Sequence, residues 1–256
     1  MTPPTIILTT LNAKYIHAAL GLRYLLANLA RHGGSDLRAM CALREFTIKR
    51  PVDEIVAALL AELGEPGSTP QIIGFGVYIW NVRQTTEVVR QLKVVRPTLK
   101  IILGGPEVSY EWEGQEIVRF ADYLITGWAD VSFARLCRAL LHGPQPLMKV
   151  IPGEQPPLDQ IDLPYAEYSA DDLAHRLLYV EASRGCPFKC EFCLSALDQT
   201  AWAFDQPRFF AALADLHARG ARHFKFVDRT FNLKIDNSLA ILQFFLDRLT
   251  SDLFLH

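Results

Sequence analysis

The stretch Ile72-Ile73-Gly74-Phe75-Gly76-Val77-Tyr78-Ile79-Trp80 decides the fold of the N-terminal half of this chain. It is apolar over most of its length and does not alternate between apolar and polar residues. A strand with this pattern is covered on both faces, as strands are in parallel sheets that carry helices on each side. We therefore expect residues 72–80 to form a strand of a parallel sheet.

Strand-like and helix-like segments alternate around this strand from residue 5 to residue 142. Short β-branched runs predict strands, and longer amphipathic runs predict helices. Gly33, Gly64 and Pro97 mark helix ends, and Asp53 is a candidate N-cap. The predicted strands are 5–11, one within 37–48, 72–80, 100–103 and 122–126, and the predicted helices are 18–31, 53–63, 82–95 and 131–141. This alternation predicts an α/β domain with a doubly wound, five-stranded parallel sheet over residues 1–142.

Ligands of doubly wound sheets bind at the carboxyl ends of the strands. The loops that follow the predicted strands on that edge are 10–17, 78–81, 104–110 and 127–130. Gly104 and Gly105 come directly after the fourth strand, and two adjacent glycines let a bulky, flat ligand approach the backbone closely. A tight turn into the next helix explains the same pair equally simply.

Residues 143–172 separate this domain from a second one. They hold six prolines and little periodic pattern, which predicts an extended linker on the surface. Residues 173–256 follow, where Asp205 and Asp236 are candidate helix N-caps and residues 177–182 and 223–227 are predicted strands. Strand and helix alternation in this region predicts the opening of a (β/α) barrel.

Composition sets the broad class of the protein. The chain has 256 residues, of which 50% are hydrophobic, and a formal net charge of −2, so we expect no nucleic-acid partner. The longest apolar runs fall short of the roughly 20 residues that a membrane-spanning helix needs. The N-terminus shows no basic-then-apolar signal sequence. We expect a cytoplasmic protein, because its cysteines resemble ligands rather than a disulfide framework.

Three of the five cysteines, Cys186, Cys190 and Cys193, lie within eight residues. Soft thiolates select zinc, copper(I) or iron–sulfur clusters. A structural zinc site needs a fourth ligand, and His217 and His223 lack the paired spacing of zinc ligands. A four-iron cluster is ordinarily held by four cysteines, so three cysteines imply one iron that is open to a substrate or cofactor. A zinc clip and three reduced cysteines remain the alternatives; Cys41 and Cys137 fit buried small apolar residues.

The pattern Cys-x-x-x-Cys-x-x-Cys, with Phe192 before the third cysteine, resembles the motif of the radical S-adenosylmethionine (SAM) superfamily. The resemblance implies that Cys186, Cys190 and Cys193 hold a [4Fe-4S] cluster whose fourth iron is chelated by SAM. It also implies that Phe192 lies beside the adenine and that Asp228 and Asn232 line the SAM site. An enzyme of this kind cleaves SAM to a 5′-deoxyadenosyl radical and takes its electron from a donor such as flavodoxin or ferredoxin.

A five-stranded α/β domain followed by this motif resembles the cobalamin-binding radical SAM enzymes. Residues 12–17, 104–109 and 181–188 resemble one uncharacterised branch of that group. The resemblance implies cobalamin at the carboxyl edge of the first sheet. The implied cobalamin contacts are Thr10, Asn12, Tyr78, Trp80, Gly104, Gly105, Pro106, Glu107 and Gly127.

Three departures from that group's pattern fall in the loops of the first domain. Cobalamin proteins that supply a histidine to the cobalt carry Asp-x-His-x-x-Gly after the first strand, whereas this chain has His17 and Gly21 at a different spacing and no matching Asp. We therefore do not assign His17 as a cobalt ligand. Val77-Tyr78-Ile79-Trp80 stands where the group has Ser-x-Leu, and residues 127–130 replace its Gly-Glu-Gly-Glu.

The expected reaction is methylation of an unactivated carbon in an unknown small-molecule or peptide substrate. Radical rearrangement or cyclisation without methyl transfer is one alternative, and a catalytically incomplete cofactor-binding chain is another. A barrel unit takes about 30 residues, so the 71 residues from Cys186 to His256 hold about two units, against the six that the resemblance implies. We expect an N-terminal fragment or a chain that needs a partner to complete its barrel.

Overall fold

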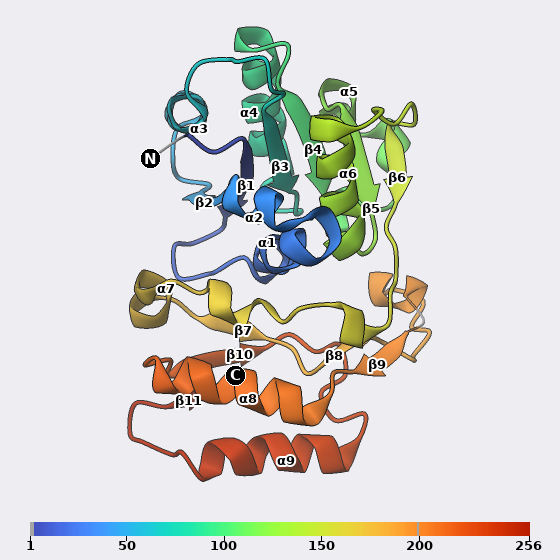
Figure 1. Ribbon diagram of the computed structural model, residues 1–256. Helices are drawn as coiled ribbons and strands as arrows, with labels where there is room; N and C mark the ends of the chain where they lie inside the picture. The colour runs from blue at the N-terminus through green and yellow to red at the C-terminus, as the bar shows by residue number, and fades with distance from the viewer. Residues whose placement is uncertain (1–2, 199) are drawn as a thin grey trace. The chain divides into compact units, whose positions relative to one another are not determined.

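The computed structural model describes residues 3–198 and 200–256, and the chain divides into two compact units, Met1–Pro156 and Pro157–His256 (Figure 1). The division falls inside the stretch 143–172 that the sequence predicts to be a linker. Each unit is an α/β structure with its own parallel sheet.

The first unit contains a parallel sheet in the order β2-β1-β3-β4-β5-β6. Its strands are β1 (Ile6–Asn12), β2 (Cys41–Thr47), β3 (Ile72–Gly76), β4 (Lys100–Gly104), β5 (Tyr123–Thr126) and β6 (Val150–Pro152). Its helices are α1 (Leu20–Gly33), α2 (Ser35–Ala39), α3 (Val52–Leu63), α4 (Val82–Val95), α5 (Glu116–Phe120) and α6 (Asp130–His142), with short 3-10 turns η1 (Pro106–Val108) and η2 (Trp112–Gly114).

Helices cover both faces of this sheet, as the doubly wound prediction requires (Figure 1). Successive side chains of a strand point to opposite faces, so β1 contributes to two cores. Ile6 and Leu8 pack with residues of α1, α2 and α6, whereas Ile7 and Leu11 pack with residues of α3, α4 and α5. Every residue of β1 is buried, which makes it a central strand of the sheet.

The sheet has six strands rather than the predicted five. β6 lies within the predicted linker and pairs in parallel with β5, with Val150 opposite Leu124. A strand of three residues shows no periodicity, and Pro152 is acceptable there because β6 is an edge strand.

Three predicted boundaries are wrong for local reasons. β3 ends at Gly76, and residues 77–81 turn into α4, because the apolar residues Tyr78 to Trp80 belong to the loop. Asp53 does not cap α3, whose N-cap is Pro51. Asp236 does not cap α9 (Ile235–Leu246), whose N-cap is Lys234. Both acids instead lie in the first helical turn, where negative charge is favourable.

The second unit contains a parallel sheet in the order β11-β10-β7. β7 (Leu178–Val180), α8 (Gln206–Ala218), β10 (His223–Phe226), α9 and β11 (Phe254–Leu255) alternate as in the opening of a (β/α) barrel. Asp205 caps α8, as predicted, and accepts a hydrogen bond from the Arg208 amide. β11 is a third strand that the sequence analysis did not assign.

Residues 158–175 are not an extended linker. They form η3 (Leu158–Gln160), η4 (Pro164–Glu167) and α7 (Ala170–His175), and Tyr165 and Tyr168 are each only 1% exposed. The Tyr168 hydroxyl donates to Tyr179 O at 2.7 Å, and the Tyr165 hydroxyl bonds both the amide and the carbonyl of Glu181 at 3.0 Å. These tyrosines satisfy backbone groups of β7 and of the residue that follows it, a role that no periodic pattern reveals.

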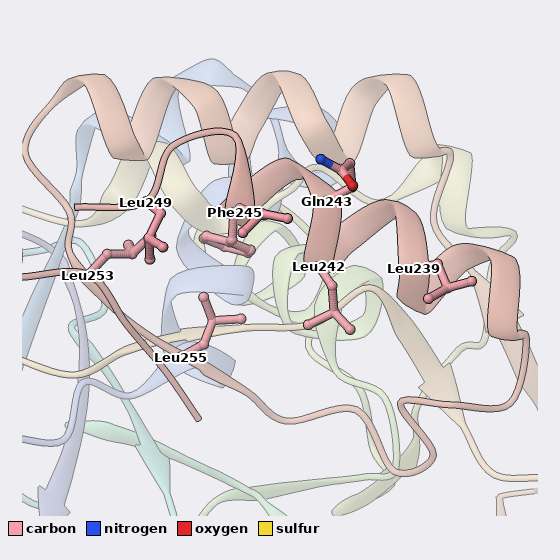
Figure 2. Close-up of a pocket in the computed structure, with 8 residues that line it drawn as sticks. Leu239, Leu242, Gln243, Phe245, Leu249, Leu253 and Leu255 are labelled. Carbon is pink, nitrogen blue, oxygen red and sulfur yellow. The ribbon is translucent and has the colours of Figure 1, made fainter. Parts of the chain in front are cut away.

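The outward face of α9 is apolar. Figure 2 shows a groove whose lining includes Leu239, Leu242 and Phe245 of α9 together with Leu249, Leu253 and Leu255. Leu239, Leu246 and Leu249 are each more than half exposed. In the part of the chain that is described, no helix combines the length and the apolar character that crossing a bilayer demands.

Tyr165→Phe tests the support of β7. The change removes the hydroxyl that satisfies two backbone groups of Glu181, so we expect the second unit to lose about 1–3 kcal/mol of unfolding free energy. Hydrogen exchange at the amides of β7 and β10 measures this loss. The matched control is Tyr110→Phe at an exposed position of the first unit, which should leave those amides unchanged. Equal protection in both variants would contradict the assigned role.

Candidate functional site

The strand order of the first sheet changes direction between β1 and β3. The chain leaves β1 toward β2 on one side, whereas β3 leads to β4, β5 and β6 on the other. Loops that diverge in this way leave a ligand crevice at the carboxyl ends of the two central strands. Here the diverging loops are 13–19, which follows β1, and 77–81, which follows β3.

Asn81 ties the two central strands together at this crevice. It is 1% exposed, and its Nδ2 lies 3.0 Å from Leu11 O, 3.1 Å from Thr10 Oγ1 and 3.2 Å from Gly76 O. Its Oδ1 accepts from the Tyr78 amide at 2.9 Å. The Thr10 hydroxyl also donates to Gly76 O at 2.7 Å. Asn81 is the N-cap residue of α4 by position, but its side chain serves the strands rather than the helix.

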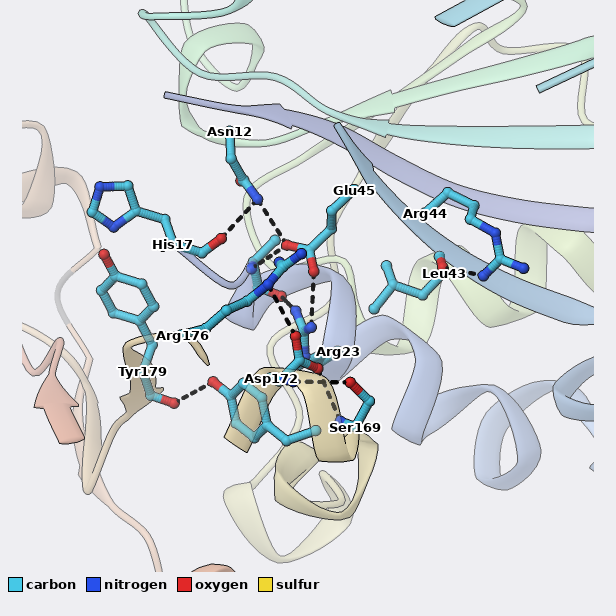
Figure 3. A network of polar contacts seen from close by, with 12 residues as sticks. Asn12, His17, Arg23, Leu43, Arg44, Glu45, Ser169, Asp172, Arg176 and Tyr179 are labelled. Atoms are coloured by element: carbon cyan, nitrogen blue, oxygen red, sulfur yellow. Dashed lines mark hydrogen bonds and ion pairs between the residues drawn. The ribbon is translucent and has the colours of Figure 1, made fainter. Parts of the chain in front are cut away.

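Glu45 on β2 holds both ends of the loop that follows β1 (Figure 3). Its Oε1 accepts from Asn12 Nδ2 at 2.9 Å and from the Ala19 amide at 2.6 Å, and its Oε2 accepts from Arg23 at 2.8 Å. The side chains of Arg23 and Glu45 are 2% and 6% exposed. A buried ion pair with this many hydrogen bonds is costly to break from one side, so it fixes the loop that contains His17.

Gly105 has a structural role. Its φ of +110° disfavours other residues, and a Cβ at this position would lie 2.4 Å from Val77 O. A Cβ at Gly104 would meet nothing closer than Ile125 O at 3.7 Å. Ser109 joins the next loop to this turn, because its hydroxyl donates to Gly105 O and accepts from the Gly127 amide. The close approach that requires glycine is therefore between two loops of the protein.

The predicted cobalamin contacts differ in what their side chains can reach. Thr10 is fully buried, and Asn12 is 7% exposed with its amide donating to His17 O and Glu45, so both position loops. Tyr78 is half-buried and stacks on the exposed Trp80 with ring centroids 4.5 Å apart. Burial, and secondly the charge of Glu45, raise the pKa of Tyr78. Pro106 and Gly127 are exposed, and Gly104 and Glu107 are half-buried.

Large apolar side chains stand exposed on the loops of this edge. Tyr15 and Ile16 follow β1, Ile79 and Trp80 follow β3, and Tyr110 follows β4. Exposed apolar residues gathered on the loops of a crevice mark a ligand or partner surface. They fit a large, flat macrocycle such as a corrin, for which these loops would supply the platform.

The cysteines lie on one loop of the second unit, which we call the cysteine loop (residues 186–200). Its base is closed by β8 (Ser183–Gly185) and β9 (Ala201–Ala203), which pair antiparallel with Gly185 opposite Ala201. Gly185 has φ +83°, and a Cβ there would lie 1.9 Å from Thr200 O, so only glycine closes this base. Residues 201–203 show no strand pattern in the sequence, so this pair was not predicted.

The three thiols fit an iron–sulfur cluster by their chemistry. The five cysteines are thiols rather than disulfide partners; Cys190 is exposed, and Cys186 and Cys193 are half-buried. Across residues 3–198 and 200–256, no three His, Cys, Asp or Glu side chains are grouped as a single metal ion requires. Soft thiolates suit both zinc and iron–sulfur clusters. That these three cysteines hold a four-iron cluster therefore stays a prediction.

Asp228, a predicted SAM contact, also joins two strand ends. It follows β10, and its carboxylate accepts from the Ala182 amide at 3.0 Å and from the Ser183 hydroxyl at 2.6 Å. Burial raises the pKa of this carboxyl, and the bonds from Ser183 and Ala182 oppose that rise. Phe192 is 94% exposed and Asn232 is exposed, so both side chains are accessible. Their contacts with SAM stay predictions.

The family of the first unit follows from its sequence. Residues 6–137, more than half of the chain, match the model of the B12 binding domain. The chain belongs to the B12-binding domain family. This membership agrees with the six-stranded sheet and with the apolar platform at its crevice, and it supports cobalamin as the ligand of this B12-binding unit.

Curated relatives extend the likeness beyond the B12-binding unit. An uncharacterised methyltransferase of Pyrococcus horikoshii is 28% identical over 208 residues, which are 70% of this chain and 44% of that protein. The cobalamin-dependent radical SAM methyltransferase TokK of Streptomyces tokunonensis is 24% identical over 196 residues, which are 66% of this chain and 28% of TokK. These matches support a place among the cobalamin-binding radical SAM proteins.

Solved structures show the same fold. The cobalamin-dependent SAM radical enzyme OxsB, with aqua-cobalamin bound, matches 99% of this chain with a TM-score of 0.70 at 17% identity. The radical SAM methyltransferase TsrM of Kitasatospora setae matches 95% with a TM-score of 0.64 at 16% identity. This chain covers 38% of the OxsB chain and 51% of the TsrM chain, so it spans about half the length of these proteins or less.

Several residues that shape the two sites were missed by the sequence analysis. Asn81 lies between a strand and a helix, directly after an apolar stretch. A polar residue at this position could have been predicted to bond the ends of the strands. Glu45, Ser109 and Ser183 act through partners that are distant in sequence, and no local pattern marks them. Thr230 lies between two predicted SAM contacts, but the sequence does not reveal its contact with Cys186.

Gly105→Ala and Gly104→Ala form a matched pair that separates the two glycines. We expect Gly105→Ala to destabilise the B12-binding unit by about 1–3 kcal/mol or more, because it combines a strained φ with a backbone clash. Gly104→Ala should change the unfolding free energy little. Denaturant titration of the two variants measures both values, and equal destabilisation would contradict the assignment of the constraint to Gly105.

Proposed function

We propose that this chain carries the cobalamin site and the cluster site of a radical SAM enzyme that methylates an unactivated carbon. The observation that supports this most is the conjunction of a B12-binding unit with three cysteine thiols in the spacing Cys-x-x-x-Cys-x-x-Cys. The thiols follow the first strand of a parallel sheet, at the end where barrel enzymes place their reactive groups.

The cluster, SAM and cobalamin would each be held by side chains with different chemistry. Cys186, Cys190 and Cys193 would ligate a [4Fe-4S] cluster, and Phe192, Asp228 and Asn232 would border SAM. The loops after β1, β3, β4 and β5 would hold cobalamin, with Trp80, Pro106 and Gly127 among the exposed positions. When bound, the cluster supplies an electron that cleaves SAM to methionine and a 5′-deoxyadenosyl radical, and cobalamin supplies a methyl group.

The protein's own residues position the loops that would hold the cofactors. Asn81 and Glu45 hold the crevice loops in place, and Gly185 closes the base of the cysteine loop. Asp228 fixes the first two strand ends of the second sheet against each other. The neutral Tyr78 phenol and the Trp80 ring offer a flat apolar surface that excludes water from one side of the crevice.

Methyl transfer is favoured over other radical chemistry by the names of the relatives. TokK and TsrM are methyltransferases, and the Pyrococcus horikoshii relative is named as one. OxsB is described as a cobalamin-dependent SAM radical enzyme without reference to methyl transfer, which keeps rearrangement or cyclisation as the second candidate. The substrate, a flavodoxin or ferredoxin donor and a cytoplasmic location belong to the proposal, as does the activity of the whole protein.

Anaerobic reconstitution with iron, sulfide and hydroxocobalamin tests the proposed sites. We expect about four irons per chain, as a [4Fe-4S] cluster requires, together with a corrin spectrum that survives gel filtration. A triple Cys→Ala variant at 186, 190 and 193 should lose the iron and keep the corrin. Cys137→Ala is the control, because this thiol is buried in the B12-binding unit and should leave the iron count unchanged.

Two results would contradict the proposal. One zinc ion per chain, with no iron cluster formed, would show that the cysteine loop is a structural zinc site. If the folded chain retains no corrin, the assignment of cobalamin as the ligand of the B12-binding unit is wrong. Either site can fail without the other, because the triple variant and the corrin spectrum report on different units.

A further inference from the structure

The turn between β10 and α9 meets the cysteine loop and the residues just before it at two points. Asp228 bonds the Ala182 amide and the Ser183 hydroxyl, as described above. Two residues later, Thr230 Oγ1 lies 3.5 Å from the sulfur of Cys186. The first contact docks the turn, and the second brings a hydroxyl within hydrogen-bonding distance of a predicted cluster ligand.

The turn holds Thr230 in a fixed position. Thr230 O accepts from the Leu233 amide at 3.2 Å, and Phe231 O accepts from the Ser238 hydroxyl at 2.8 Å. The ring of Phe231 packs edge-on against Phe226 of β10, with centroids 5.0 Å apart. Thr230 is thus presented to Cys186 from a turn that is anchored to both β10 and α9.

The direction of the Thr230–Cys186 hydrogen bond follows from the state of the sulfur. Either atom can donate when Cys186 is a thiol. A metal-bound cysteine is a thiolate and carries no proton, so the threonine hydroxyl must then be the donor. Hydrogen bonds to the sulfurs are among the factors that set the reduction potential of iron–sulfur clusters.

We propose that Thr230 is a positioning residue for the cluster, whose hydroxyl donates to the Cys186 sulfur and raises the cluster's reduction potential. Reduction adds one negative charge to the cluster and its thiolates, and a donor at sulfur stabilises that charge more than it stabilises the oxidised state. The inference rests on the proposed function, because it requires Cys186 to be a cluster ligand.

Thr230→Val and Thr230→Ser form the test pair. Valine keeps the branched shape and removes the hydroxyl, whereas serine keeps the hydroxyl. The midpoint potential of the reconstituted full chain is measured for each by redox titration followed by electron paramagnetic resonance, with iron counted in parallel. We expect wild type and Thr230→Ser to agree and Thr230→Val to have a lower potential.

At a fixed electrode potential, we expect Thr230→Val to lower the ratio of reduced to oxidised cluster by up to roughly tenfold. A tenfold change in this ratio corresponds to a change of about 59 mV in the midpoint potential of a one-electron couple. A Thr230→Val variant with the wild-type potential and iron count would overturn the inference. Loss of iron in Thr230→Val but not in Thr230→Ser would support it, because the hydroxyl would then be needed to hold Cys186 in place. If wild type itself binds no cluster, the proposed function fails, which is a different result.

Discussion

Cross-strand hydrogen bonds at the carboxyl ends of parallel strands are the interaction on which both candidate sites depend. Where such strands end, their last backbone groups lose ladder partners and must find others. Asn81, after β3, binds Leu11 O of β1, and Asp228, after β10, binds the Ala182 amide beyond β7. In each unit, one side chain from a loop fixes the neighbouring strand end and, with it, the loop that would hold the cofactor.

The sequence predicts the parts of the fold whose signals are local and repeated. The alternation of strands and amphipathic helices over residues 5–142 yields the doubly wound sheet, because burial on both faces leaves an uninterrupted apolar run at β3 and a β-branched, mostly apolar run at β1. β6 and β11 have three and two residues and show no period. The stretch around Tyr165 and Tyr168 looks like a linker because prolines dominate it, yet its aromatic residues are buried.

The residues of the candidate sites also differ in whether local sequence signals reveal them. Three cysteines in a short spacing can be found by inspection, since all the ligands lie on one loop. The partners that position this loop cannot be found in this way, because Asp228 contacts Ala182, just before the loop, across 46 residues, and Thr230 contacts Cys186 across 44 residues. Thr10 and Asn12 stand at the predicted edge of the sheet, where their polar atoms make contacts with Gly76, Glu45 and His17 that the sequence does not reveal. Their contacts with cobalamin stay predictions.

The central claim is that three cysteines leave one iron of a four-iron cluster open to SAM. Electron–nuclear double resonance on the reduced, reconstituted chain tests it directly, with SAM isotopically labelled at its amine nitrogen. The account predicts a hyperfine coupling from the labelled nitrogen, which disappears when unlabelled SAM replaces it. A reduced four-iron cluster that shows no coupling to SAM under saturating conditions would contradict the claim, because its fourth iron would then be bound by something else.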